Sequence, residues 1–567
     1  MFFGIAIGFV IAPRNGFFHY FVFFRLRTDI VNSLLNELHM KKYLLFTVLW
    51  WTLLLDWPFW QKALAFFDGQ PDWTFLLILA IVFGLLNLAF LRLLAYLPHR
   101  AFQVIMILLT LIGAGAFCGA YLYGVAITPN MMRNVIATDT AEAAGYLSLK
   151  TIALFLLVSV VPVIYTVLLK RPVKVAWGWA KGLAIILLSL AVSVGLVMNT
   201  FQDMAGFFRG QKDARYFLAP YNVVYSYART FATDQSPDDV KNRTVLDAHP
   251  ERLVKPTRPT LFVMVVGETA RVANWELSGY ARETNPELKK IPQLINFLST
   301  TACGTSTDES VPCLFSPIGR HNYDRDAILQ TEPLPAVLQR AGFDVEWIDN
   351  QSGCKGACYN VPERKVEKNP TYCPDGTCMD GAFLPELDKA LANVKPAESK
   401  VLILHMMGSH GPAYYERSPE AVKAFGPECR DAALNNCSRE MIEAEFDNSL
   451  RYTDWVLAEL IKRLEAAKGV DTALLYVSDH GESLGEGGLY LHGAPYFIAP
   501  DVQKEVPMVM WFSPEFETDY QVNRSALEAV AKTKDATHDH LYHTIMGLLK
   551  VKGDTYDVKY DLQRTRP

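Results

Sequence analysis

The chain has 567 residues, a net charge of −5 and an apolar content of 51%. This length exceeds that of one ordinary domain, and the negative net charge argues against a nucleic-acid partner bound by bulk electrostatics. The apolar residues are concentrated in the first third of the chain. We therefore expect a membrane-embedded part followed by a polar part.

Residues 1–39 are an unusual start for a membrane protein. The apolar run over 2–12 is too short to cross a bilayer, which needs about 20 residues, and basic residues interrupt the stretch after it. The sequence Met40-Lys41-Lys42 is a more usual opening. We interpret 1–39 as an N-terminal extension upstream of a natural start at Met40.

Five apolar stretches come next, and each is long enough to cross a bilayer. They are expected over 43–66, 73–97, 102–125, 147–169 and 177–198. The flanks and short loops on one side are basic, with Lys41, Lys42, Arg92, His99, Arg100, Lys170, Arg171, Lys174 and Lys181. By the positive-inside rule these loops face the cytoplasm. The pattern predicts a five-helix transmembrane domain over 40–199, with everything after it outside the cytoplasm.

The loop after the third expected span is polar. Asn134, Thr138 and Glu142 are spaced four apart, so a helix would place them on one face. Such a face could bind a polar lipid head group, although spacing alone favours an ordinary solvated helix face. Residues 200–258 carry aromatic residues at helical spacing and end in a polar, proline-containing stretch. This pattern indicates an interfacial amphipathic segment and a linker, with packing onto the spans as the alternative.

The nine cysteines are distributed unevenly. Cys118 lies in an apolar run, and the other eight lie in the polar part: Cys303, Cys313, Cys354, Cys358, Cys373, Cys378, Cys429 and Cys437. An even number in near neighbours is typical of disulfides in an oxidising compartment. Proximity favours the pairs 303–313, 354–358, 373–378 and 429–437. A zinc cluster is the alternative, but no two matching C-x₂-C pairs are present.

From Thr260 onward apolar strands alternate with helical stretches, which predicts an α/β domain over 259–567. Three buried strands are expected over 261–266, 400–405 and 472–477. Their carboxyl ends carry acidic or imidazole side chains, namely Glu268, His405, Asp479 and His480. If the strands lie side by side, these ends converge on one edge, and carboxylate with imidazole suits zinc. For Glu268 alone, capping of the next helix would be a sufficient explanation.

A catalytic metal would need a nucleophile beside it. The stretch 303–313 is rich in hydroxyl groups and has a cysteine at each end, so a disulfide there would hold a fixed geometry. A hydroxyl bound to zinc loses its proton more easily. The residues alone do not choose among Thr305, Ser306 and Thr307, and an N-capping run before a helix is the alternative.

Five groups of residues carry a resemblance to a known family. They are Gly267-Glu-Thr-Ala-Arg271, Cys303-Gly-Thr-Ser-Thr307 with Ser310-Val-Pro-Cys313, Gly408-Ser-His-Gly-Pro412, Ser478-Asp-His-Gly-Glu-Ser-Leu-Gly485 and Leu491-His-Gly493. In order and spacing they resemble the lipid A phosphoethanolamine transferases, which include the mobile colistin-resistance enzymes and belong to the alkaline phosphatase/sulfatase superfamily. The resemblance covers nearly everything after Met40, including the five expected spans.

The resemblance implies a five-helix transmembrane domain joined to a periplasmic α/β domain of the alkaline phosphatase/sulfatase type, in the bacterial inner membrane and as a monomer. It implies a zinc-dependent enzyme that moves phosphoethanolamine from phosphatidylethanolamine to a lipid A phosphate and releases diacylglycerol. The product would be less negative, so lower susceptibility to polymyxins such as colistin is expected.

The resemblance also implies roles for individual residues. Thr307 would be the nucleophile and would carry phosphoethanolamine covalently. One Zn²⁺ would be held by Glu268, Thr307, Asp479 and His480, and His410 and His492 would hold the donor phosphate or a second zinc. The residues implied for donor binding are His410, His492, Lys355, Asn134, Thr138 and Glu142.

Two features depart from the family pattern. Asp308 and Glu309 come after Thr307 where small or apolar residues would be expected, and two acids should repel an anionic acceptor unless they bind a second metal. Gln351 stands where asparagine would be more usual. The alternatives are transfer to a core sugar, a phosphoglycerol transferase of the lipoteichoic acid type, a sulfatase-type hydrolase and a membrane-tethered periplasmic binding module.

Overall fold

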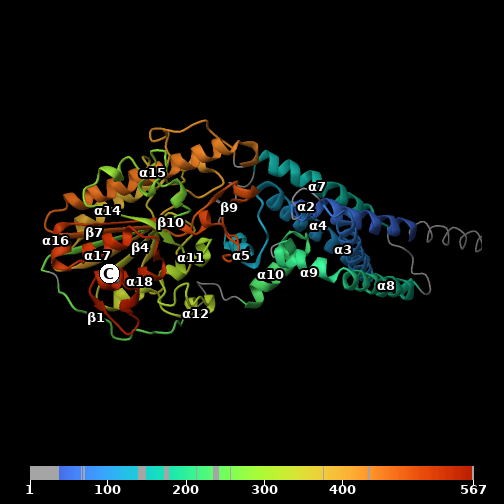
Figure 1. Cartoon of the computed structure of the whole chain (residues 1–567), viewed down its shortest axis with the longest axis horizontal. Helices are drawn as coiled ribbons and strands as arrows, with labels where there is room; N and C mark the ends of the chain where they lie inside the picture. Colours follow the sequence, from blue (N-terminus) through green and yellow to red (C-terminus); the bar gives the residue numbers. More distant parts are fainter. Residues whose placement is uncertain are drawn as a thin grey trace, which may run out of the picture. The chain divides into compact units, whose positions relative to one another are not determined.

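The computed structural model (Figure 1) describes residues 37–564 apart from 66, 68–70, 138–147, 171–177, 212–213, 234–241, 256, 375 and 432–433. The chain forms two compact units. The first comprises Met1–Phe117 and Leu154–Tyr221, and the second comprises Cys118–Ala153 and Asn222–Pro567. The polar segment between the third and fourth expected spans therefore groups with the C-terminal unit. Thr138 and Glu142 lie outside the described residues, as does nearly all of the extension 1–39.

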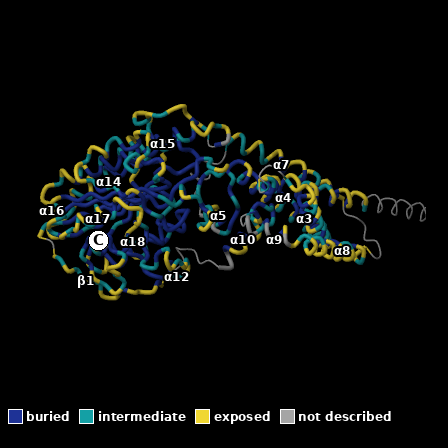
Figure 2. The backbone as a smooth tube through the Cα atoms, viewed as in Figure 1, coloured by how far each residue is buried: buried dark blue, intermediate teal, exposed yellow. Residues whose placement is uncertain are grey.

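Four described helices are long and apolar enough to cross a membrane. They are α3 (Trp73–Leu94), α4 (His99–Tyr123), α7 (Leu149–Leu168) and α8 (Gly178–Asn199). They correspond to four of the five expected spans. Many apolar side chains of α7 and α8 are exposed, as is typical of surfaces that face lipid (Figure 2).

The stretch expected as the first span is not one continuous helix among the described residues. Residues 37–49 are helical, followed by a π-helical segment, η1 (Trp50–Leu55), and by α2 (Trp57–Ala65). The interruption falls at Asp56, whose carboxylate accepts a hydrogen bond of 2.9 Å from the backbone N–H of Ala219. This unit also contains α9 (Phe201–Gly210) and η2 (Ala214–Phe217).

The second unit is built on an eight-stranded sheet of order β11-β3-β10-β7-β2-β6-β4-β5. The strands are β2 (Thr260–Gly267), β3 (Ile295–Thr301), β4 (Asp344–Asp349), β5 (Glu363–Lys365), β6 (Ser399–His405), β7 (Asp471–Ser478), β10 (Glu505–Phe512) and β11 (Ala536–Thr537). The three expected strands lie side by side, because β2 pairs in parallel with both β6 and β7. β10 runs antiparallel to β7 and β3.

Helices cover both faces of this sheet (Figure 1). On one face Phe262, Met264 and Val266 of β2 pack into an apolar core with α13 (Leu334–Arg340), α16 (Pro514–Asp519), α17 (Arg524–Ala531) and α18 (Asp539–Leu548). On the other face the long helix α15 (Arg439–Ala466) packs against β7, and α14 (Phe383–Asn393) lies beside α15. Covered on both sides, β2 buries all its residues, as expected for a central parallel strand.

Several shorter elements complete this unit. They are α5 (Pro129–Ala137), α10 (Tyr221–Thr233), α11 (Thr307–Leu314), α12 (Arg325–Gln330), the pair β1 (Glu251–Arg252) with β12 (Val551–Lys552) and the pair β8 (Ser483–Leu484) with β9 (Tyr490–Leu491). The hydroxyl of Ser226 in α10 donates to the carbonyl of Ile127, just before α5, at 2.6 Å. The disulfides are Cys303–Cys313, Cys354–Cys358, Cys373–Cys378 and Cys429–Cys437, the pairs that proximity favours.

Candidate active site

Two adjacent strand ends bring an acid and an acid–imidazole pair together. Glu268 directly follows β2, and Asp479 and His480 directly follow β7. Gly267 and Ser478 are paired in register, so the two carboxylates emerge at equivalent positions of neighbouring strands. Ligand atoms of Glu268, Asp479 and His480 lie within 4.8 Å of one another, and all three residues are fully buried.

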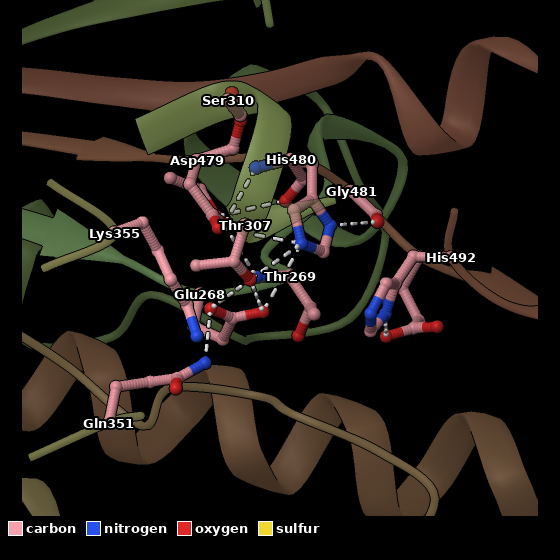
Figure 3. A network of polar contacts seen from close by, with 12 residues as sticks. Glu268, Thr269, Thr307, Ser310, Gln351, Lys355, Asp479, His480, Gly481 and His492 are labelled. Atoms are coloured by element: carbon pink, nitrogen blue, oxygen red, sulfur yellow. Dashed lines mark hydrogen bonds and ion pairs between the residues drawn. The ribbon is translucent and has the colours of Figure 1, made fainter. Parts of the chain in front are cut away.

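A hydroxyl completes this cluster (Figure 3). Thr307 is the first residue of α11, after Ser306 at the N-cap position. Its Oγ1 lies 3.1 and 3.4 Å from the carboxylate oxygens of Glu268 and 3.4 Å from Nε2 of His480. The hydroxyl of Thr305 instead donates to the carbonyl of Ala494 at 2.6 Å. Of the three hydroxyl residues left open by the sequence, Thr307 is therefore the one whose hydroxyl contacts the cluster.

The backbone around Glu268 is crowded in a way that requires glycine. A Cβ on Gly408 would lie 2.6 Å from the carbonyl oxygen of Glu268, and Gly408 has φ of +52°. A Cβ on Gly267 would lie 2.5 Å from the ring of Tyr476. Glycine accepts both the close approach and the left-handed conformation, so these two positions let Glu268 sit inside the sheet edge.

The electrostatics of the cluster are set by two buried carboxylates and one imidazole. Burial, and then the charge of Glu268, raise the pKa of Asp479 to about 7. Burial opposes the charged form of His480, but Asp479 and Glu268 outweigh it and raise the pKa of His480 to about 10. Burial also acts against ionised Glu268, yet His480 holds the pKa of Glu268 well below its usual range. Negative charge thus outweighs positive charge here once both carboxylates ionise.

The residues present fit a zinc ion. Two carboxylates and an imidazole are donor types that zinc takes in tetrahedral catalytic sites, which leave a fourth position for another oxygen. Oδ2 of Asp479 is buried and accepts no hydrogen bond from any described residue, although it lies 3.4 Å from Nε2 of His480. Nδ1 of His480 lies 2.9 Å from the carbonyl of Gly481, which directs Nε2 toward the cluster. Nε2 of Gln351 donates to Glu268 at 2.8 Å and fixes that carboxylate.

The two other predicted histidines lie close to this cluster. The ring centroid of His492 lies 4.4 Å from that of His480 and 5.5 Å from that of His410. Burial lowers the pKa of His410 to about 3, so its ring is neutral near pH 7. Nδ1 of His492 lies 3.3 Å from a carboxylate oxygen of the buried Glu482. Both imidazoles therefore lie beside the cluster of Glu268, Asp479 and His480.

The two remaining predicted residues that the structure describes, Lys355 and Asn134, lie in different segments of the second unit. The ammonium of Lys355 donates to the hydroxyl of Ser352 at 2.7 Å, and its side chain points to the same side of the cluster as Gln351 (Figure 3). Nδ2 of Asn134, in α5, lies 3.4 Å from where a Cβ on Gly493 would stand. α5 thus contacts the loop that directly follows His492.

The two acids after the nucleophile are embedded among arginines. Oδ2 of Asp308 lies 3.2 Å from Arg325 of α12 and 3.5 Å from Arg133 of α5. Burial raises the pKa of Glu309, while the charge of Arg133 opposes that rise. Two guanidinium groups therefore balance the charge of Asp308, which weakens the repulsion of an anion that this residue would otherwise exert.

The third strand end differs from the expectation. His405 ends β6, but its Nδ1 lies 2.7 Å from Asp349 at the end of β4 and not at the cluster.

Two supporting residues were also not assigned from the sequence. Ser310 donates to the carbonyl of Asp479, and His538 lies between the backbone N–H of Cys303, at 3.2 Å, and the carbonyl of Ser478, at 3.1 Å. Ser310 lies in the motif Ser310-Val-Pro-Cys313, whereas no local sequence pattern marks His538.

A doubly covered sheet whose strand ends hold carboxylates and an imidazole, with a threonine hydroxyl from the start of a helix beside them, defines a protein of the alkaline phosphatase/sulfatase class. The Sulfatase family model matches residues 260–551. A second family model, described as phosphoethanolamine transferase EptA/EptB, matches residues 78–234. The chain belongs to the phosphoethanolamine transferase family, as its motifs predicted.

Individual phosphoethanolamine transferases are similar to this chain over most of its length. The chain is 37% identical to phosphoethanolamine transferase EptA of Salmonella typhimurium, covering 80% of this chain and 83% of that protein. It is 34% identical to phosphatidylethanolamine transferase Mcr-1 of Escherichia coli, covering 88% and 92%. The structure of the integral membrane lipooligosaccharide phosphoethanolamine transferase A of Neisseria meningitidis matches with a TM-score of 0.86 at 32% identity, covering 92% of this chain and 98% of that one.

Proposed function

We propose that the protein transfers phosphoethanolamine from phosphatidylethanolamine to a phosphate of lipid A through a covalent intermediate on Thr307. The observation that carries this proposal is the position of the Thr307 hydroxyl, 3.1 Å from Glu268 and 3.4 Å from His480 in a buried cluster. Membership of the phosphoethanolamine transferase family supplies the reaction class. Relatives at 26% identity are named for transfer to Kdo(2)-lipid A, so a core sugar is the competing acceptor.

In the first step the Thr307 oxygen attacks the phosphorus of the donor. The new oxygen–phosphorus bond forms as the bond to diacylglycerol breaks. The hydroxyl proton leaves to water and the departing diacylglycerol oxygen takes one up, so the proton count balances. Glu268, Thr307, Asp479 and His480 would hold a zinc ion, which would supply a Lewis acid that lowers the pKa of the hydroxyl.

In the second step an oxygen of the acceptor phosphate attacks the same phosphorus, and the Thr307 oxygen leaves and regains a proton. Phosphoryl transfer depends on holding the two oxygens in line and on balancing charge on the phosphate. His410, His492 and Lys355 would orient the phosphate. Asn134, with Thr138 and Glu142, would hold the ethanolamine end.

We also propose that five crossings place the C-terminal unit in the periplasm, that residues 43–66 form the interrupted first crossing, and that the enzyme works as a monomer with one zinc ion or two. The four disulfides are in keeping with this oxidising compartment. A lipid A product with less negative charge would lower polymyxin susceptibility.

Intact-protein mass spectrometry after incubation with phosphatidylethanolamine tests the intermediate. The wild type should gain the mass of one phosphoethanolamine, and Thr307→Ala should gain none while keeping zinc through its three other ligands. Thr305→Ala is the matched control, because that hydroxyl donates to the carbonyl of Ala494 instead of contacting the cluster, and it should still gain the adduct. An adduct on Thr307→Ala would overturn the assignment of the nucleophile. Mass spectrometry of lipid A from expressing cells then separates the phosphate from a core sugar as acceptor.

A further inference from the structure

An apolar groove crosses the surface of the membrane unit, away from the residues assigned above. It has a volume of about 380 Å³ and is lined by the helix over 37–49, by α3 and by Ile185 of α8. This volume is within the range of small-ligand sites, roughly 300–1,000 Å³. Gly84 opens the groove at its centre, where an added Cβ would meet only Val48, at 3.7 Å.

The groove has a charged end and an apolar end. Val48 lies opposite Gly84. Lys41, seven residues before Val48, and Arg92, eight residues after Gly84, also line the groove. At 1.5 Å per helical residue the two cations lie roughly 10–12 Å along the helices from Gly84. The lining between them is made of leucine, isoleucine and valine side chains.

The cations at the charged end are not fully compensated. Lys41 is paired with Glu37 at 2.9 Å. Arg92, which is half-buried, makes no hydrogen bond and no ion pair with any residue in the described part of the chain. Lys181, at the start of α8, adds a further positive charge that acts on Glu37. Among the described residues, the negative charge of Glu37 is set against the positive charges of Lys41, Lys181 and Arg92, so this end of the groove favours an anion.

We propose that this groove is a binding site for an anionic glycerophospholipid, with its phosphate at Arg92 and Lys41 and one acyl chain between Val48 and Gly84. Arginine pairs with phosphate through two donors in a fixed fork. A zwitterionic lipid offers the same acyl chain but carries a cation that Arg92 and Lys181 would repel. In the orientation proposed from the basic loops, this end of the groove faces the cytoplasm. The site would then lie in the cytoplasmic leaflet, whereas the proposed transfer reaction takes place on the periplasmic side.

Native mass spectrometry of the delipidated full-length protein in nonionic detergent tests the proposal. Phosphatidylglycerol and phosphatidylcholine with identical acyl chains are the probes, which keeps the donor lipid out of the experiment. Each cation near a phosphate contributes about 1 kcal/mol, or about fivefold in affinity. We expect phosphatidylglycerol to bind more tightly than phosphatidylcholine, and Arg92→Gln to remove about fivefold of that preference.

Matched variants separate the parts of the site. Lys170→Gln removes a cation of the same side that does not line the groove, and should leave binding unchanged. Gly84→Leu fills the groove and should weaken both lipids, whereas Gly195→Leu, whose added side chain meets open space, should weaken neither. Arg92→Lys keeps the charge and should retain most of the preference, which distinguishes a lost contact from misfolding.

Several results would overturn the proposal. Equal binding of the two lipids by the wild type would mean adventitious lipid only. Unchanged phosphatidylglycerol binding by both Arg92→Gln and Gly84→Leu would place the lipid elsewhere. A chain beginning at Met40 that binds phosphatidylglycerol when the full chain does not would assign the groove to the N-terminal segment, and dimer peaks abolished by Gly84→Leu would assign it to a second copy.

Discussion

Substitution of Gln351 tests whether a hydrogen bond to Glu268 positions this proposed zinc ligand. Its Nε2 donates to Glu268 at 2.8 Å inside a site where Gln351 is only 5% exposed and Glu268 is fully buried. Gln351→Met keeps the length of the side chain and removes the donor. A hydrogen bond to a charged group contributes about 1.5–3 kcal/mol, which corresponds to roughly 10- to 150-fold in affinity at about 1.4 kcal/mol per tenfold. Loss of a partner that orients a metal ligand usually costs 10–100-fold.

We therefore expect Gln351→Met to bind zinc about 10- to 100-fold more weakly, measured by competition with a fluorescent chelator on the full-length protein. Gln339→Met, at an exposed helical position, is the control and should bind as the wild type does. In the metal-free state Gln339→Met should unfold as the wild type does, whereas Gln351→Met should unfold at a lower temperature but still cooperatively, because the buried Glu268 carboxylate loses a donor. A zinc affinity within about twofold of the wild type, with the fold intact, would refute the idea that Gln351 positions Glu268.

Asp308→Asn and Arg133→Gln should each raise the KM for phosphatidylethanolamine without changing zinc affinity. Their double-mutant cycle should give a coupling of about 0.5–3 kcal/mol, and strict additivity would mean that the ion pair does not hold α5 to α11. Burial lowers the pKa of His538 to about 4 against about 6.5 when unfolded. The unfolded chain therefore takes up this proton first, so His538 should contribute a loss of stability of at most about 3 kcal/mol as pH falls from about 6.5 to 4. His538→Gln should flatten this slope in urea unfolding, and an unchanged slope would exclude His538 as its source. Replacing Cys303 and Cys313 by serine should cost about 2–3 kcal/mol in urea unfolding and slow transfer, and unchanged kinetics would show that the disulfide does not position the nucleophile.

The parts of the site that can be predicted from the sequence are those set by local pattern. Apolar runs that stop at a polar residue predict where a buried strand ends, and Glu268, Asp479 and His480 are each within two residues of such a stop. Parallel pairing in register then brings the ends together. Which hydroxyl completes the cluster depends on the start of α11, and Thr305 and Thr307 differ there by two residues that local pattern treats alike.

The parts that cannot be predicted in this way are contacts between distant segments. Gln351 and Glu268 are 83 residues apart, and His538 and Cys303 are 235 apart. His405 has the same strand-end signal as Glu268, yet Asp349 on the neighbouring strand takes up its Nδ1. The sequence does not show whether a buried histidine binds a metal or a carboxylate, because either one can be the partner of a ring nitrogen.

Charge balance explains how acids can flank a site that handles anions. A carboxylate repels a phosphate only to the extent that its own charge is uncompensated, and Coulomb energy between unit charges at 4 Å is about 4 kcal/mol at an effective dielectric of 20. Asp308 faces two guanidinium groups at 3.2 and 3.5 Å. The carboxylate and the guanidinium groups together act as a dipole, and the field of a dipole falls off with distance faster than that of a free charge. The two arginines come from α5 and α12, so the acid that would repel the acceptor also ties the proposed donor-binding helix to the helix of the nucleophile. A small apolar residue at position 308 would avoid the repulsion but would leave Arg133 and Arg325 without this shared carboxylate.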